Sequence, residues 1–302
     1  MKHIFIINPI AGKKDSTQII SKKLKRYKNI IDYDIYVTKT RHDATHFIRQ
    51  WCNNNPTNRV RFYACGGDGT INEVVNGIMG FGNAEMTCYP SGSGNDFIKY
   101  YSSKANFLDI KALINGKINE VDVIKINDLY SINVCNVGME ATAAKNMIEI
   151  KRKPIIGGSK ISYIVGAIKA FIKARRNHTN IIVDNVEMNN ETFLTCNFSN
   201  GRYVGGGFMC GPKSLNDDGL MDISIIKDIP LPKLIFMIFS YIKGTYLDKE
   251  NIQPYVKYTT GKSAEIFAEH DFDVAVDGEI IRGKHFKIEI INKAIKFISP
   301  AQ

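Results

Sequence analysis

The segment VRFYACGGDGT, residues 60–70, decides the fold expected for this chain. Its apolar first half predicts a buried strand over 60–65, and the pattern of 71–79 predicts a helix after the glycine turn. Three glycines let the backbone adopt positive φ and pass close to a ligand. A strand, a glycine turn and a helix in this order direct backbone N–H groups and the positive helix end toward a phosphate.

Asp68 lies at the tip of this turn and limits the kinds of ligand that the turn can bind. A carboxylate would repel a bare phosphate, so Asp68 fits a site that also holds a cation or an acceptor hydroxyl. That combination indicates phosphoryl transfer from a magnesium nucleotide. The structural alternative is a tight turn with a capping aspartate.

Composition and charge narrow the class of protein. The chain has 302 residues, which suits two domains, with 44% hydrophobic and 23% charged residues, as in soluble globular proteins. A net charge of +10 favours an acidic partner such as a nucleotide, a nucleic acid or an anionic membrane. Six cysteines without CxxC spacing are expected to be reduced core residues. Met1 runs straight into a strand, so we expect a cytoplasmic protein without a signal peptide.

The first 120 residues alternate strands with helices, which predicts an α/β domain with a mostly parallel sheet and helices on both faces. Expected strands cover 4–7, 35–37, 60–65 and 86–89, and expected helices cover 15–27, 43–51 and 71–79. Three loops that follow strands carry glycines and polar side chains: 8–12, 66–70 and 90–97. Because ligands bind at the carboxyl ends of the strands in such sheets, all three loops can face one crevice.

The pattern changes near Glu120 to strands joined by Asn, Asp and Gly turns, which predicts an antiparallel, sandwich-like second domain. The expected division is 1–122 and 123–293, with 294–302 as a candidate last strand of the first domain. The expected strands cover 121–126, 132–137, 181–186, 192–198, 223–226, 262–268, 273–276, 286–291 and 295–298.

Two segments interrupt these strands. Residues 159–175 have helical apolar spacing with a border of basic residues, which fits either a solvated helix face or a helix lying on anionic lipid. The apolar segment 234–242, after Pro232, is too short to span a bilayer.

Other motifs are weaker or absent. Phe97 stands where the dinucleotide fingerprint needs its third glycine, so that motif is missing. His42 and His46 lack the glutamate of a zinc hydrolase and suit a solvated helix face. The run 216–222 is either a plain hairpin turn or a site for a hard cation held by carboxylate and carbonyl oxygens.

Taken together and in this order, the motifs resemble the diacylglycerol kinase catalytic-domain family, which includes sphingosine kinases and bacterial soluble lipid kinases. The resemblance covers essentially the whole chain. It implies a nucleotide domain of the NAD-kinase and phosphofructokinase type, a C-terminal β-sandwich and a cleft between them. The matching motifs are Asn8-Pro9-x-x-Gly12, GGDGT at 66–70 with Asn72-Glu73, Pro90-x-Gly92-Ser93-x-Asn95-Asp96-Phe97, Asp122, Asp218-Gly219-Leu220 and Asp277-Gly278-Glu279.

The resemblance also implies roles for individual residues. Asp68 would serve the catalytic metal and the phosphates, and Glu279 would take the proton from the lipid hydroxyl. Ser93 departs from the family, where most members have Thr, so the hydroxyl is kept but a methyl contact is lost. A structural Mg²⁺ would be held by Asp218 and by the carbonyls of Leu215 and Leu220. The ATP site would comprise Asn8, Pro9, Ile10, Ala11, Gly12, Thr38, Gly66, Gly67, Asp68, Gly69, Thr70, Ile71, Asn72, Glu73, Ser93, Asn95 and Asp96.

The sequence therefore predicts an ATP- and Mg²⁺-dependent lipid kinase, with diacylglycerol as the favoured acceptor and phosphatidic acid as the product. Kinases for a sphingoid base, another lipid or NAD remain alternatives, as does a non-catalytic protein that binds anionic lipid or nucleic acid. For the kinase we expect a lipid alcohol substrate, peripheral contact with an anionic membrane surface and no nucleic acid partner. A homodimer is compatible with the sequence.

Overall fold

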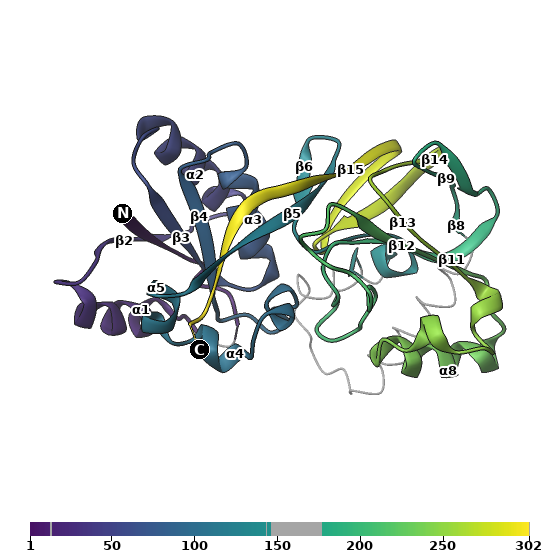
Figure 1. Cartoon of the computed structure of the whole chain (residues 1–302), viewed down its shortest axis with the longest axis horizontal. Coiled ribbons are helices and arrows are strands. Elements are labelled where there is room, and N and C mark those ends of the chain that lie inside the picture. The colour runs from purple at the N-terminus through teal and green to yellow at the C-terminus, as the bar shows by residue number, and fades with distance from the viewer. Residues whose placement is uncertain (13, 143, 146–176, 302) are drawn as a thin grey trace, which may run out of the picture.

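The N-terminal half is built on four parallel strands, in the order β2-β1-β3-β4. The computed structural model (Figure 1) describes residues 1–12, 14–142, 144–145 and 177–301. Every residue of β3 and β4 is buried, because helices cover both faces of a parallel sheet. The strands are β1 (Lys2–Ile7), β2 (Asp32–Val37), β3 (Val60–Gly66) and β4 (Ala84–Pro90).

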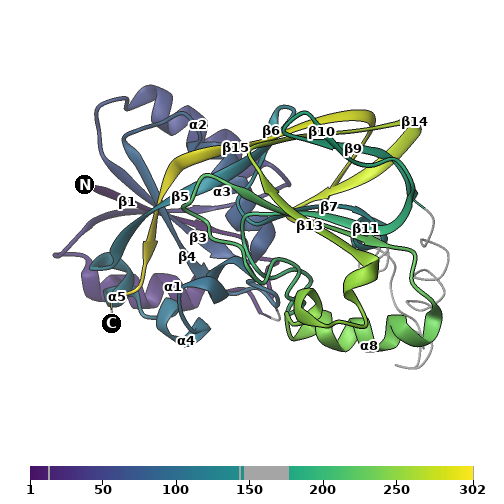
Figure 2. The ribbon, with the colours of Figure 1, turned by 45° about the vertical axis from the view of Figure 1, so that its right-hand side comes forward.

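The helices of this half lie on the two faces of the sheet (Figures 1 and 2). One face carries α2 (Asp43–Asn54) and α3 (Asp68–Ile78), which pack against each other. The other carries α1 (Thr17–Leu24), η1 (Lys25–Tyr27), α4 (Lys104–Phe107) and α5 (Ile110–Ile114), and η2 (Phe97–Tyr100) follows the third loop. The predicted α/β domain is confirmed.

The C-terminal half is antiparallel, as predicted. Its strands alternate between two cores, because successive side chains point to opposite faces. Val134 and Leu194 pack toward α8 (Leu231–Ile242), whereas Cys135 and Cys196 belong to the core on the other face. The remaining elements are β6 (Leu129–Ser131), β7 (Val134–Gly138), β8 (Asn177–His178), β9 (Asn180–Val183), β10 (Val186–Asn189), β11 (Thr192–Ser199), β12 (Met221–Lys227), η3 (Tyr246–Asp248), η4 (Gln253–Tyr255), β13 (Val256–Gly261) and β14 (Ser263–Val276).

Two strands join the halves into one hydrogen-bonded sheet. The first part of β15 (Glu279–Ser299) pairs with β14, and its second part pairs with β5 (Lys117–Ile126). Near its end, Phe297 pairs in parallel with Met86 of β4. Figure 1 shows β15 running from the C-terminal half into the N-terminal sheet. The predicted domain boundaries stay predictions, and both strands continue across them.

Several predicted strands need correction. The four strands predicted over 262–298 are two long ones, β14 and β15, because register shifts interrupt the alternation without ending either strand. The strand predicted over 181–186 is the hairpin β9–β10, which turns at Asp184 and Asn185, both with positive φ. β13 was not predicted. The helix predicted over 159–175 lies outside the described residues.

The six cysteines are all buried and free, as predicted. No helix in the described part of the chain is long and apolar enough to cross a membrane.

A buried ion pair ties β3 to β4 and generates the first prediction. Arg61 Nε donates to Glu85 Oε1 at 2.7 Å, and Arg61 Nη1 donates to the carbonyls of Leu113 and Ile114 at 2.7 and 2.8 Å. Arg61→Met should lower the free energy of unfolding by about 3–5 kcal/mol in urea titrations, because it leaves the Glu85 carboxylate buried without its main partner. Arg61→Met/Glu85→Leu should recover much of that loss. A double variant as unstable as the single one would contradict this account.

Candidate active site

The three predicted loops meet at the carboxyl ends of β1, β3 and β4. The N–H groups of Ser91 and Gly92 donate to the Gly66 carbonyl at 2.9 and 3.0 Å. A Cβ on Gly92 would lie 2.4 Å from the Gly67 Cα, and one on Gly12 would lie 2.1 Å from the Ser91 oxygen. These loops therefore pack backbone to backbone, which only glycine permits at these positions.

The first loop is also fixed by side chains. Asn8 Nδ2 donates to Thr70 Oγ1 at 3.3 Å, so the end of β1 contacts the start of α3. Thr38 N donates to the Ile7 carbonyl at 2.9 Å, which places Thr38 beside the same loop. A Cβ on Gly69 would have no atom within 4 Å, so the space above the first turn of α3 is open. An eleven-residue helix with an open glycine in its first turn suits a phosphate.

Two residues of the predicted nucleotide set have partners outside this crevice. The Glu73 carboxylate accepts from the N–H groups of His42 and Ala44 at 3.0 and 3.1 Å, which fixes the start of α2. Asn72 Nδ2 donates to the Tyr130 carbonyl and to Asp277 Oδ2, both at 2.9 Å. Nucleotide contacts of Asn72 and Glu73 stay predictions. Four other members of the set line one cavity: Asp68, Ile71, Ser93 and Asp96.

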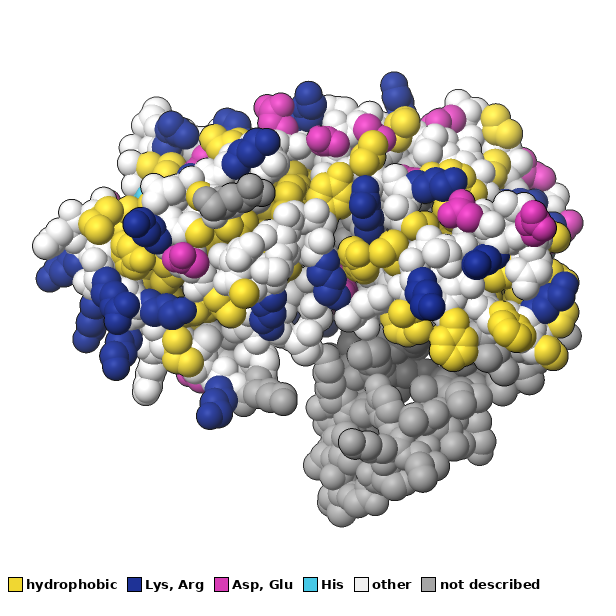
Figure 3. Space-filling view, turned by 60° about the horizontal axis from the view of Figure 1, so that its bottom comes forward, with side chains coloured by type: hydrophobic (Ala, Val, Ile, Leu, Met, Phe, Trp, Pro, Cys, Tyr) yellow, Lys and Arg dark blue, Asp and Glu magenta, His cyan; other side chains and the backbone are white. Residues whose placement is uncertain are grey.

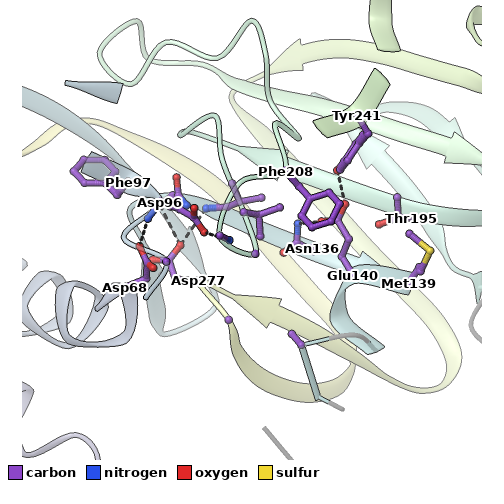
Figure 4. Close-up of a pocket in the computed structure, with 18 of the residues that line it drawn as sticks. Asp68, Asp96, Phe97, Asn136, Met139, Glu140, Thr195, Phe208, Tyr241 and Asp277 are labelled. Atoms are coloured by element: carbon purple, nitrogen blue, oxygen red, sulfur yellow. Dashed lines mark hydrogen bonds between the residues drawn. The ribbon is translucent and has the colours of Figure 1, made fainter. Parts of the chain in front are cut away.

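The carboxylates of Asp68 and Asp96 lie together where these loops line the cavity (Figure 4). Asp68 Oδ1 accepts from the Asp96 N–H at 2.6 Å. Burial raises the pKa of Asp68 to about 6, and the negative charge of Asp96 adds to the shift. Asp96 itself pairs with Lys99 at 2.5 Å and accepts from Gly206 N at 2.7 Å, so a loop of the C-terminal half closes on it.

Asp277 is the third carboxylate of the cavity, and it lies in the predicted Asp-Gly turn between β14 and β15. The resemblance had assigned the base to Glu279, two residues further on. In this structure Asp277 and Gly278 line the cavity, while the Glu279 carboxylate forms an ion pair with Arg41. The role of Glu279 as base stays a prediction.

The cavity has a volume of about 660 Å³ and runs from the Asp68 carboxylate into the C-terminal half. Its far part is mostly apolar and is lined by Met139, Phe208, Met237 and Ile238, among others. Sequence reasoning missed this lining. The signal was available: the segment 234–242 is apolar on all sides, and the glycine run 205–207 precedes Phe208.

A polar cluster around Glu140 lies within the apolar part of the cavity, and the sequence did not predict it. The Glu140 carboxylate accepts from Asn136 Nδ2 at 2.6 Å and from the Tyr241 hydroxyl. Asn197 closes the ring through Tyr241 and Asn136, at 2.7 Å each. Burial raises the pKa of Glu140 to about 7, although these hydrogen bonds oppose the shift.

The predicted metal loop lies apart from the cavity. Asp122 Oδ2 accepts from Gly219 N at 2.6 Å, and its N–H donates to the Asn216 carbonyl at 2.8 Å, so buried Asp122 fixes the loop. The exposed Asp218 carboxylate accepts from Leu220 N at 3.0 Å. The ligands that this loop could offer a metal are the Asp218 carboxylate and the carbonyls of Leu215 and Leu220, all oxygen atoms, which fits a hard cation. Among the described residues, no group of three or more His, Cys, Asp or Glu side chains gathers as metal ligands.

The Asp68 carboxylate of the glycine turn shares a cavity with an apolar lining, an arrangement that suits a phosphotransferase acting on an apolar molecule. Comparison with known proteins gives the same class. The family model of the diacylglycerol kinase catalytic domain matches residues 2–126, and that of the YegS C-terminal NAD kinase beta sandwich-like domain matches residues 133–299. The chain therefore belongs to the family of lipid kinases that combine a diacylglycerol kinase catalytic domain with a YegS-type C-terminal domain.

Individual relatives align over nearly the whole chain. A "Probable lipid kinase YegS-like" protein of Serratia proteamaculans is 26% identical over 97% of this chain and 92% of its own. One of Yersinia enterocolitica with the same name is 27% identical over 98% and 96%. A solved structure titled as a diacylglycerol kinase of Bacillus anthracis has a TM-score of 0.73 at 21% identity, covering 98% and 96% of the two chains, which shows the shared fold.

The raised pKa of Asp68 generates the second prediction. Because burial disfavours the ionised carboxylate, the cost to stability is complete above about pH 6 and declines as the pH falls from there toward 3.8, the ordinary pKa of an aspartate. Asp68→Asn should therefore have a higher free energy of unfolding than the wild type at pH 7.5, by at most about 3 kcal/mol in urea titrations, with a smaller difference at pH 5.

The same variant should lose most turnover, because it removes the charge that the family motif assigns to the metal and the phosphates. The exposed Asp128, in the turn before β6, supplies the matched control Asp128→Asn, which should change neither property. Wild-type turnover in Asp68→Asn would exclude Asp68 from catalysis. A pH-independent loss of stability would contradict the cost assigned to its burial.

Proposed function

We propose that this protein transfers the γ-phosphoryl group of ATP, with Mg²⁺, to a lipid hydroxyl, and that diacylglycerol is the acceptor and phosphatidic acid the product. One observation carries the proposal. A single cavity joins the Asp68 carboxylate of the glycine turn, with Ser93 and Gly94 of the third loop, at one end to an apolar lining at the other. Such a cavity can hold a phosphate and a hydrocarbon chain side by side.

In this proposal the N-terminal half binds the nucleotide. The phosphates lie over Gly69 and the start of α3, where backbone N–H groups and the helix dipole favour negative charge. Ser93 supplies a hydroxyl from the third loop. Mg²⁺ would neutralise the charge that develops on the transferred phosphoryl group, and Asp68 would be the carboxylate that holds it.

The acceptor hydroxyl needs a base, and two carboxylates are candidates. Glu279 is the one that the family motif implies, and it must first leave its ion pair with Arg41. Asp68 already lines the cavity, and its pKa of about 6 is close to the range that suits a general base at neutral pH. We propose Glu279 as the base and Asp68 as the metal and phosphate residue.

Further parts of the proposal rest on the family motifs. Asp218, with the carbonyls of Leu215 and Leu220, would hold a structural Mg²⁺ in the loop that Asp122 fixes. The enzyme would act in the cytoplasm and touch an anionic membrane peripherally.

The apolar lining favours a lipid over NAD as acceptor, because NAD carries charged phosphates and polar riboses.

An acceptor assay tests the function. Purified protein is incubated with labelled ATP and Mg²⁺, and diacylglycerol micelles, sphingosine micelles or NAD are compared as acceptors. We expect labelled phosphatidic acid, with much less product from the other two. Product from NAD alone would make this an NAD kinase, and absence of transfer to every acceptor would favour a non-catalytic binding protein.

The base assignment is the third prediction. Glu279→Gln should lower kcat by about 10²- to 10⁴-fold with little change in ATP affinity, since it removes the proton acceptor. Arg41→Met is the matched control: it removes the other member of the ion pair and should retain or raise kcat. A Glu279→Gln kcat within about threefold of wild type would leave Asp68 or a water as the base.

A further inference from the structure

Helix α8 is apolar on opposite sides, which is unusual for a helix at a protein surface. Its inward side is buried: Leu234, Met237 and Tyr241 pack under the sheet. Its outward side carries three exposed apolar side chains, Phe236 at 66%, Phe239 at 61% and Ile242 at 43%. In soluble proteins a group of large exposed apolar side chains usually marks a contact surface.

These exposed residues form one stripe along the helix. They are three residues apart, so at 100° per residue they advance along adjacent turns of the same side. Two lysines flank the stripe. Lys243 lies seven residues, or about two turns, after Phe236 on that side. Lys233 lies one turn before it, with its ammonium 3.2 Å from the Tyr255 hydroxyl.

The helix that carries the stripe also lines the cavity. Met237, Ile238 and Tyr241 of the same helix line it, and so does Phe208, which is 40% exposed and whose ring lies beside that of Tyr241. Met209 N donates to the Tyr241 carbonyl at 3.1 Å, which ties the Phe208 loop to the end of α8. Figure 3 shows hydrophobic side chains with basic ones among them on the side where α8 comes forward.

We propose that the α8 stripe, Phe236, Phe239 and Ile242 with Lys233 and Lys243, is the surface by which this protein docks on an anionic lipid bilayer. The aromatic and aliphatic side chains enter the acyl region, and the two ammonium groups meet anionic headgroups. The lipid acceptor then enters the cavity past Phe208 without crossing water. This inference rests on the proposed function for its purpose, but the docking surface is testable without catalysis.

Charge favours a bilayer over a second copy of the chain as the occupant. In a twofold contact between two copies of α8 packed antiparallel, Lys233 of one copy would face Lys243 of the other. Like charges would then meet at both ends of an apolar contact, whereas an anionic surface is complementary to both. The net charge of +10 adds long-range attraction to such a surface.

Vesicle sedimentation without ATP tests the surface. The wild type should bind vesicles of phosphatidylcholine with phosphatidylglycerol, and Phe236→Gln/Phe239→Gln should bind at least tenfold more weakly. Glutamine keeps the helix propensity, and a melting curve checks the fold. Lys233→Gln/Lys243→Gln should bind more weakly at low salt and lose most of the salt dependence. Ile30→Gln and Val186→Thr, at exposed apolar residues away from α8, should bind as wild type.

A second readout separates docking from catalysis. With long-chain diacylglycerol in vesicles, the phenylalanine variant should lose activity about in proportion to its lost binding. With dispersed dihexanoylglycerol its activity should equal that of wild type, because the cavity is untouched. Wild-type vesicle binding by both Phe236→Gln/Phe239→Gln and Lys233→Gln/Lys243→Gln would overturn the proposal. So would a change of oligomeric state in the phenylalanine variant with unchanged vesicle binding, which would make the stripe a contact between copies.

Discussion

The Asp277 carboxylate is the constraint on which the site depends. It accepts five hydrogen bonds: from Asn72 Nδ2, from Ser131 Oγ, and from the N–H groups of Ile132, Asn133 and Val134 at 2.6–3.1 Å. Asn72 belongs to α3, directly after the glycine turn, and the other donors belong to β6, β7 and the residues between them. One carboxylate therefore ties β6 and β7 of the C-terminal half to α3 of the N-terminal half, and charge-assisted bonds of this kind are among the stronger ones available.

The site concentrates acidic groups that a stable core would avoid. Asp68 and Glu140 both have raised pKa values because they are buried, and Asp96 and Asp277 lie in the same cavity. Each is held by hydrogen bonds from the chain, which is how buried carboxylates are retained. Buried carboxylates with raised pKa values gather at functional sites more often than in ordinary cores, so function explains these acidic groups more simply than folding does.

The sequence could predict the elements whose signals are local. The strand, glycine turn and helix at 60–78 and the Asp-Gly turn at 277–278 follow from residue types with fixed conformational needs. The meeting of the three loops followed from the rule for parallel sheets. The strand pattern failed at bulges, because a bulge breaks the alternation of β14 and β15 without ending either strand.

The lining of the cavity could not be predicted, because it depends on which distant segments meet. Nothing local pairs Glu140 with Tyr241, or places Phe208 beside α8. The different surroundings of Asp277 and Glu279 have the same origin. Both carboxylates flank one glycine, and only the packing of β6 and β7 decides which of them faces the cavity.

The central claim is that Asp277 assembles a site from a nucleotide half and an acceptor half, and one pair of measurements on Asp277→Asn tests it. The amide keeps one acceptor oxygen but presents N–H groups to donors. ATP affinity by calorimetry should stay within about threefold of wild type, because the three nucleotide loops lie in the N-terminal half. Turnover of diacylglycerol should fall about 10²-fold or more, because the acceptor half is displaced. Wild-type turnover in this variant would contradict the account.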